Sequence, residues 1–181
     1  MYNPPSGAVL RGLDEGPVTT IFVDKQAPIL MEIGSPNAQD IIAESDWSDV
    51  MIQLTVRELE QLNPDSLVLN YAVHPAGLGL NVAAMYDGQK PMELLGGRAH
   101  GEQIPIAATL DLDDIISESD RTDALELRVW VTGEDMAGNA FSEDFNDVDA
   151  PFHTWDLEQR VPDFTFVGEP SVKYGSDSVR V

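Results

Sequence analysis

The sequence contains no cysteine and few basic residues. Its 181 residues include 32 acidic but only 10 basic side chains, so the formal net charge is −22. Without cysteine there can be no disulfide bonds, thiolate nucleophiles or cysteine-ligated zinc. The shortage of lysine and arginine disfavours binding to nucleic acid or to an anionic membrane surface, because both depend on neutralising phosphate groups. Cations are the partners that such an acidic surface attracts.

Long apolar runs are also absent. No stretch approaches the roughly 18 apolar residues of a membrane-spanning helix, and the N-terminal residues lack the basic and apolar regions of a signal peptide. We therefore expect no membrane insertion. The last residues of the chain fall within a predicted strand, and we expect both ends to be cuts through a longer polypeptide.

Short runs of alternating apolar and polar residues make up most of the chain. This pattern is typical of antiparallel strands that bury one face, particularly where Gly, Pro, Asp or Asn bounds each run. About six to eight such strands predict an all-β fold, an immunoglobulin-like antiparallel β-sandwich with short flanking segments. The clearest runs are residues 50–56, 66–73, 104–112 and 124–132.

Helical patterning is scarce. Residues 57–63 and 111–119 have the composition for one or two helical turns each. Asp87-Gly88 has the residue types of a two-residue hairpin turn, which would join two strands there.

The segment VTGEDMAGNAF, residues 131–141, has the composition of a turn between two strands. Gly138 readily adopts a positive φ, and the carboxylate of Asp135 can accept hydrogen bonds from backbone N–H groups two residues further on. Glu134 and Asp135 would point to opposite faces of a strand, which disfavours a shared catalytic role.

Two similar segments suggest the edges of one module. Residues 22–30 and 147–154 both contain Val-Asp, then Ala-Pro, then an apolar residue. Proline and the residue before it favour extended backbone, so both segments resemble joints. We therefore expect residues 1–23 to be a tail or the last strand of a preceding module, residues 24–147 to be the sandwich, and residues 148–181 to be a linker and the first strand of a following module.

The edges of this module carry a family resemblance. VWVTGEDMAGNAF (129–141) resembles the penultimate strand and terminal turn of bacterial and archaeal immunoglobulin-like repeat domains, and VDKQAPILMEIGSP (23–36) is similar to their opening. EPSVKYGSDSVRV (169–181) resembles the first strand of an adhesion-type immunoglobulin domain. The resemblance implies a non-catalytic spacer or adhesion module of a larger prokaryotic protein, extracellular or at the cell surface. Its implied partners are neighbouring domains of the same chain and surface glycans or proteins.

The joint at residues 143–152 is rich in oxygen donors, the ligands that Ca²⁺ takes. It is similar to the calcium linker of cadherins, but Val148 replaces an expected amide and Pro151 lies one position late. Because clusters of this kind also arise from acidic composition alone, a plain strand turn stays open as the alternative. The candidate ligands for Ca²⁺, the one cofactor considered, are Asp144, Asn146, Asp147, Asp149 and Asp135.

No motif nominates an active site. His74, His100 and His153 are isolated in the sequence, and the signatures of zinc proteases, serine hydrolases and phosphate-binding loops are absent. We therefore expect no catalytic or cofactor-binding residues and no enzymatic activity.

The tryptophans support an alternative function. Aromatic rings can stack on sugars, so Trp47, Trp130 and Trp155 would suit a carbohydrate- or calcium-dependent binding module that accompanies a secreted enzyme. For Trp130, we favour packing beneath a loop or in a domain contact over sugar stacking.

The acidic surface predicts stabilisation by salt. In about 1 M salt the Debye length falls to roughly 3 Å, so repulsion across the surface is largely screened. We expect the melting temperature to rise from dilute buffer to molar potassium chloride, and a constant value would contradict this. Comparing chloride with sulfate separates screening from the exclusion of salt from the protein surface.

Overall fold

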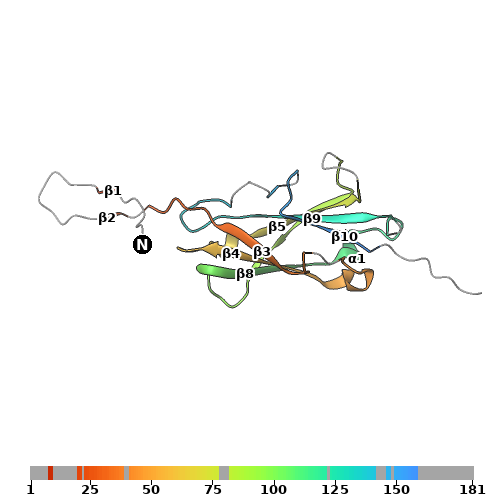
Figure 1. Cartoon of the computed structure of the whole chain (residues 1–181), viewed down its shortest axis with the longest axis horizontal. Helices are drawn as coiled ribbons and strands as arrows, with labels where there is room; N and C mark the ends of the chain where they lie inside the picture. Colours follow the sequence, from red (N-terminus) through yellow and green to blue (C-terminus); the bar gives the residue numbers. More distant parts are fainter. Residues whose placement is uncertain are drawn as a thin grey trace, which may run out of the picture.

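The computed structural model is an all-β sandwich of two antiparallel four-stranded sheets that pack face to face (Figure 1). Two further short strands, β1 (Ala8–Val9) and β2 (Thr20–Ile21), pair with each other. The structure describes residues 8–9, 20–21, 23–38, 41–77, 82–121, 123–141, 146–147 and 149–158.

The two sheets have the orders β3-β4-β8-β7 and β10-β9-β5-β6. If these strands are lettered A, B, C, C′, D, E, F and G along the chain, the sheets become ABED and GFCC′, which is the immunoglobulin strand order. The predicted immunoglobulin-like sandwich is therefore confirmed. The strands are β3 (Ile29–Ser35), β4 (Val50–Glu58), β5 (Val68–Pro75), β6 (Tyr86–Pro91), β7 (Glu93–Leu94), β8 (Gly101–Leu110), β9 (Leu125–Thr132) and β10 (His153–Leu157).

The core lies between the sheets and is built from the predicted apolar positions. In β9, which is flanked by β10 and β5, Leu127, Val129 and Val131 are fully buried. Complete burial of such a side chain contributes about 1.5–3 kcal/mol. The same alternation supplies Val50, Ile52, Leu54 and Val56 from β4, Leu67, Leu69, Tyr71 and Val73 from the β5 region, and Ile104, Ile106, Ala108 and Leu110 from β8.

The outer face of β5 and β9 is more buried than one-sided alternation predicts. Asn70, His74 and Arg128 are at most 4% exposed. Asn70 donates a hydrogen bond to Thr132 Oγ1 (3.0 Å) and accepts one from the Gln89 side chain (2.9 Å). Asn70 thus joins β5 to both of its neighbouring strands through side-chain hydrogen bonds.

The predicted hairpin turn at Asp87-Gly88 is wrong. Both residues lie within β6, where Gly88 pairs with Tyr71 of β5. A Cβ atom at Gly88 would overlap the Tyr71 hydroxyl group. Glycine is needed here to make room for the ring, which explains a turn-like sequence inside a strand.

Of the two segments that could form helical turns, one does. The helix α1 (Leu112–Ile115) forms one turn, capped by a hydrogen bond from the Asp114 N–H to Asp111 Oδ1 (3.1 Å). At 57–63 the chain instead continues as β4 to Glu58, because strand pairing with β8 persists to that residue. The remaining helical segments within the described residues are two short 3₁₀ turns, η1 (Glu44–Asp49) and η2 (Pro64–Ser66). Among the described residues, no helix is long and apolar enough to cross a lipid bilayer.

The sandwich continues beyond the expected boundary at residue 147. β10 pairs with β9 from His153 opposite Val129 to Leu157 opposite Leu125, and Trp155 is 1% exposed. The Ala-Pro joint at 150–151 therefore leads into an edge strand of the same module, a place that tolerates proline. Residues 159–181, where a following module was expected, lie outside the described residues, as do most of residues 1–22.

Val129 provides a direct test of this register. Val129→Asp would bury an unpaired carboxylate at a fully buried position and should cost about 4 kcal/mol or more, enough to unfold the sandwich. The exposed Thr109 of β8 is the control: Thr109→Asp should cost less than about 1 kcal/mol. Chemical denaturation followed by tryptophan fluorescence measures both, and equal stability of the two variants would contradict the register.

Candidate cation site

The turn after β9 forms as predicted and fixes Asp135. Gly138 has a φ of 87°, and Glu134 pairs with Ala140 across the turn. The Asp135 Oδ1 atom accepts hydrogen bonds from the N–H groups of Ala137 (2.8 Å) and Asn139 (2.9 Å). The Asn139 side chain donates to Oδ2 (2.6 Å). The Asp135 carboxylate is thus held in one orientation and is 1% exposed.

In the acidic joint, the side chains of Asn146 and Asp147 form hydrogen bonds with backbone groups of the protein. The Asn146 amide accepts from the Val131 N–H (2.9 Å) and donates to the Val131 carbonyl (2.5 Å), so it continues the hydrogen bonding of β9 beyond β10. Asp147 Oδ1 accepts from the N–H groups of Asp149 (2.8 Å) and Ala150 (2.6 Å). Asp144, another member of the predicted ligand set, lies outside the described residues.

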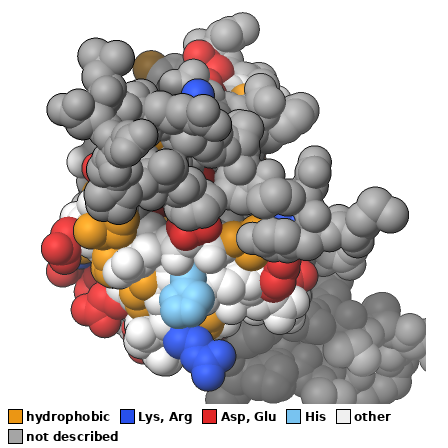
Figure 2. Space-filling model, turned by 90° about the vertical axis from the view of Figure 1, so that its left-hand side faces the viewer, with side chains coloured by type: hydrophobic (Ala, Val, Ile, Leu, Met, Phe, Trp, Pro, Cys, Tyr) orange, Lys and Arg blue, Asp and Glu red, His pale blue; other side chains and the backbone are white. Residues whose placement is uncertain are grey.

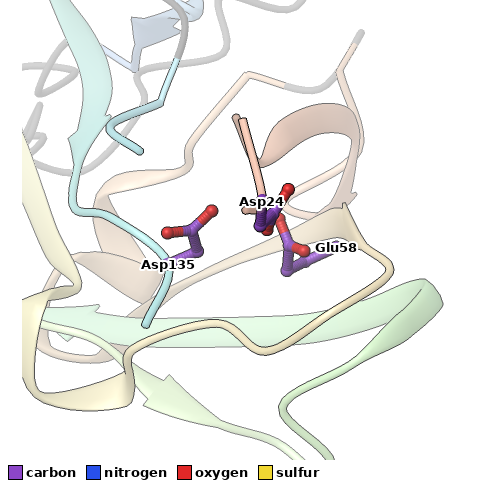
Figure 3. A group of neighbouring side chains, drawn as sticks. All are labelled: Asp24, Glu58 and Asp135. Carbon is purple, nitrogen blue, oxygen red and sulfur yellow. The ribbon is translucent and has the colours of Figure 1, made fainter. Parts of the chain in front are cut away.

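The structure brings Asp135 together with two carboxylates that the sequence did not nominate. One oxygen of each of Asp24, Glu58 and Asp135 lies within 4.8 Å of the others. Figure 3 shows the three side chains pointing toward one another from separate segments. Asp147 and Asp149 do not join this group, so the joint site stays a prediction.

Local hydrogen bonding explains why these segments meet. The chain after β4 bonds to the turn after β9: the Met136 N–H donates to the Gln61 carbonyl (2.8 Å) and the Asn63 N–H to the Glu134 carbonyl (3.0 Å). Asp135 is therefore held next to the end of β4, where Glu58 lies. Asp24 comes from residues 23–28, which lead into β3 beside β4.

Glu58 continues the apolar alternation of β4. Positions 50, 52, 54 and 56 face the core, and Glu58 takes the next inward position, where it is 3% exposed. Its Oε1 atom accepts from the Glu60 N–H (2.8 Å). Among the described residues, the buried Glu58 Oε2 and Asp24 Oδ2 atoms have no hydrogen-bond partner. Burying a carboxylate oxygen in this way costs free energy, because the oxygen loses its hydrogen bonds to water and gains no other partner.

The electrostatics of the two buried carboxylates differ. Burial raises the pKa of Glu58; the hydrogen bond from Glu60 opposes the shift, and the nearby charges of Asp135 and Asp24 add to it. Burial also raises the pKa of Asp135, but hydrogen bonds from Asn139 and Ala137 outweigh it, so that its pKa is lowered. Asp135 is therefore ionised at neutral pH, and its charge acts directly on Glu58.

No described ion pair neutralises this group. The two ion pairs within the described residues join Arg121 to Asp113 and Arg128 to Glu126. Figure 2 looks at the end of the molecule where the chain enters the sandwich, and acidic, basic and hydrophobic side chains all lie there. The charges that act on Glu58 are those of Asp135, Asp24 and Glu60, and all three raise its pKa.

An all-oxygen group of this kind suits a hard cation such as Ca²⁺ or Mg²⁺. Paired carboxylates also serve as acid and base, but that chemistry needs a cavity that binds a substrate beside them. One open hollow in the described part of the chain lies between the end of β3 and η1, and it is lined by Pro36, Ile41 and Met51 among others.

The histidines do not contribute to the group. His74 is buried in β5, and burial together with the charge of Arg128 lowers its pKa, although Glu126 and the Val82 backbone oppose the shift. His153 contacts the Ala38 carbonyl (3.0 Å) and the Trp155 ring, and burial lowers its pKa. His100 is exposed. Within the described residues, no histidine joins a group of three metal-ligating side chains.

Two of the three tryptophans are unsuited to sugar stacking. Trp47 and Trp155 are each 1% exposed. Their indole N–H groups donate to the carbonyls of Ile42 (3.4 Å) and Asn37 (3.1 Å), respectively. Both rings belong to the core, and only Trp130 is partly accessible.

Neither a family model, nor a curated protein, nor a solved structure matches the chain.

A variant of Asn146 distinguishes a structural role of this residue from a role as a calcium ligand. Asn146→Asp keeps the acceptor for the Val131 N–H but loses the donor to the Val131 carbonyl, which should cost about 1–3 kcal/mol of stability. We expect this loss with and without calcium, measured by chemical denaturation, and little change for the exposed Asp149→Asn control. A calcium ligand would behave differently, since a carboxylate in place of the amide would strengthen binding.

Proposed function

We propose that the chain is a non-catalytic spacer or adhesion module of a larger cell-surface or secreted protein. The observation that carries this proposal is the placement of the sandwich's two ends. The chain enters at one end of the long axis and leaves at the other, so that modules in series would extend rather than fold back.

Strand pairing supports this placement. The entry segment precedes Ile29, which pairs with Arg57 at the end of β4, and Leu62 just beyond β4 bridges to Asp135. The exit follows Leu157, which pairs with Leu125 at the start of β9. Because β9 runs from the exit end to the entry end, the chain arrives and departs at opposite ends.

This geometry is suited to bearing tension. A pull on the two ends would load β3 along β4 and β10 along β9, so each terminal strand would be sheared. The inter-strand hydrogen bonds of an antiparallel pair lie across the strands, and a shearing force acts on all of them together. At the exit, Ile42 adds hydrogen bonds with Asp156 (3.1 Å) and Glu158 (2.9 Å).

Immunoglobulin-like repeats of surface proteins share the strand order and the Val-Asp and Ala-Pro motifs, which supports the cell-surface assignment. The burial of Trp47 and Trp155 disfavours the alternative of a sugar-stacking module. Neighbouring domains of the same chain are the partners that end-to-end placement favours.

Force spectroscopy tests the load-bearing role. The sequence has no cysteine, so Val23→Cys and Glu158→Cys supply two unique attachment points. Pulling between them should unfold the sandwich in one high-force step and lengthen the chain by roughly 400 Å, given about 3.3–3.6 Å per extended residue.

The control uses Ala124→Cys with Glu158→Cys, two exposed positions that flank the paired residues Leu125 and Leu157 at one end. Pulling there separates β9 and β10 one hydrogen bond at a time and should need a much lower force. If shearing and unzipping geometries give the same force, the ends of the sandwich are not built for tension, and the spacer role is contradicted.

A further inference from the structure

We propose that Asp24, Glu58 and Asp135 bind one divalent cation, Ca²⁺, which fastens the entry segment to the body of the sandwich. The site differs from the joint at 143–152 and does not depend on a load-bearing role. It draws its ligands from three segments: the residues before β3, the end of β4 and the turn after β9 (Figure 3).

The first support is the condition of Glu58. Its side chain is 3% exposed and points into the group (Figure 3), and among the described residues its Oε2 atom has no hydrogen-bond donor. Asp24 Oδ2 is buried without a partner in the same way. A solvated acidic cluster would not bury oxygens like these. A cation held between these carboxylates would supply the opposite charge that they lack.

The second support is the spacing of the oxygens. Ca²⁺ binds oxygen at about 2.3–2.6 Å and therefore bridges oxygens up to roughly 5 Å apart. Oxygens within 4.8 Å of one another fit around such an ion. Mg²⁺, with ligands at about 2.0–2.1 Å, requires a tighter octahedron. Asp24 is only partly buried, so water molecules can supply the remaining ligands of the ion.

The third support is how firmly two ligands are held. Asp135 is oriented by the N–H groups of Ala137 and Asn139 and by the Asn139 amide. Asp24 Oδ1 accepts from the Gln26 N–H (2.9 Å), which fixes its side chain to the entry segment. Ligands that are oriented in advance lose little conformational freedom on binding.

Such an ion would connect both sheets and the entry segment at one point. Glu58 belongs to the sheet of β3 and β4, whereas Asp135 follows β9 of the other sheet. Asp24 lies in residues 23–28, which lead into β3. The ion would therefore clamp the two sheets together at the entry end and fix the direction in which the chain enters.

Calorimetric titration of the full chain is the test. The protein is stripped with a chelator, and CaCl₂ or MgCl₂ is added at ionic strength held constant with KCl, so that screening of the acidic surface does not change. The variants are Glu58→Gln, which alters a proposed ligand, and Glu102→Gln, which removes the same charge from an exposed position on β8. Asp147→Asn tests the joint, and Asp24→Asn is the second ligand variant if Glu58→Gln does not fold.

Wild type, Glu102→Gln and Asp147→Asn should bind one Ca²⁺ with similar affinity and melt at a higher temperature when it is bound. Glu58→Gln should weaken the affinity at least about tenfold, since changes even to outer-shell partners of metals commonly cost about 10–100-fold. Without calcium it should melt no lower than wild type, because it removes an uncompensated charge.

Three results would overturn the site. They are no saturable calcium binding by the wild type at millimolar concentration, equal binding by Glu58→Gln, or loss of binding in Asp147→Asn with retention in Glu58→Gln. The last result would place the ion in the joint instead.

Discussion

The burial of β4 and β8 against β5 and β9 is the constraint on which the rest of the structure depends. Each strand turns every second side chain inward, and a shift of register by one residue would expose the whole apolar set. The same alternation acts on polar residues. It turns the side chain of Glu58 inward at the end of β4. This end of the strand lies beside the turn after β9.

The strand rows and the turn at residues 134–140 could be predicted from the sequence, because both are local signals. Alternation shows directly which face of β9 is buried, and Asp135 with Gly138 specifies a turn with its own hydrogen bonds. The turn at Asp87-Gly88 was predicted wrongly because the glycine makes room for Tyr71, a residue that is distant in sequence. β10 was placed outside the module since its proline-bearing approach resembles a linker, while its pairing with β9 is non-local.

The candidate site shows the same limit. The sequence nominated Asp135 but combined it with neighbouring acidic residues, because local density was the available signal. Glu58 reaches it through the hydrogen bonds that tie residues 61–63 to residues 134–136, and Asp24 through the pairing of β3 with β4. One trace was present in the sequence: Glu58 follows Val50, Ile52, Leu54 and Val56 at the same spacing, and a carboxylate that continues an apolar row needs a partner. Asn146, nominated as a ligand, instead completes the hydrogen bonding of Val131.

A crystal structure grown with calcium, using the anomalous signal of the ion, tests the central claim most directly: that inward alternation brings carboxylates to a place where a cation must balance them. The account predicts one peak between Asp24, Glu58 and Asp135, with oxygen distances of about 2.3–2.6 Å. A lysine or arginine side chain at that position, or a calcium peak in the joint at 143–152 with none between these three residues, would contradict it.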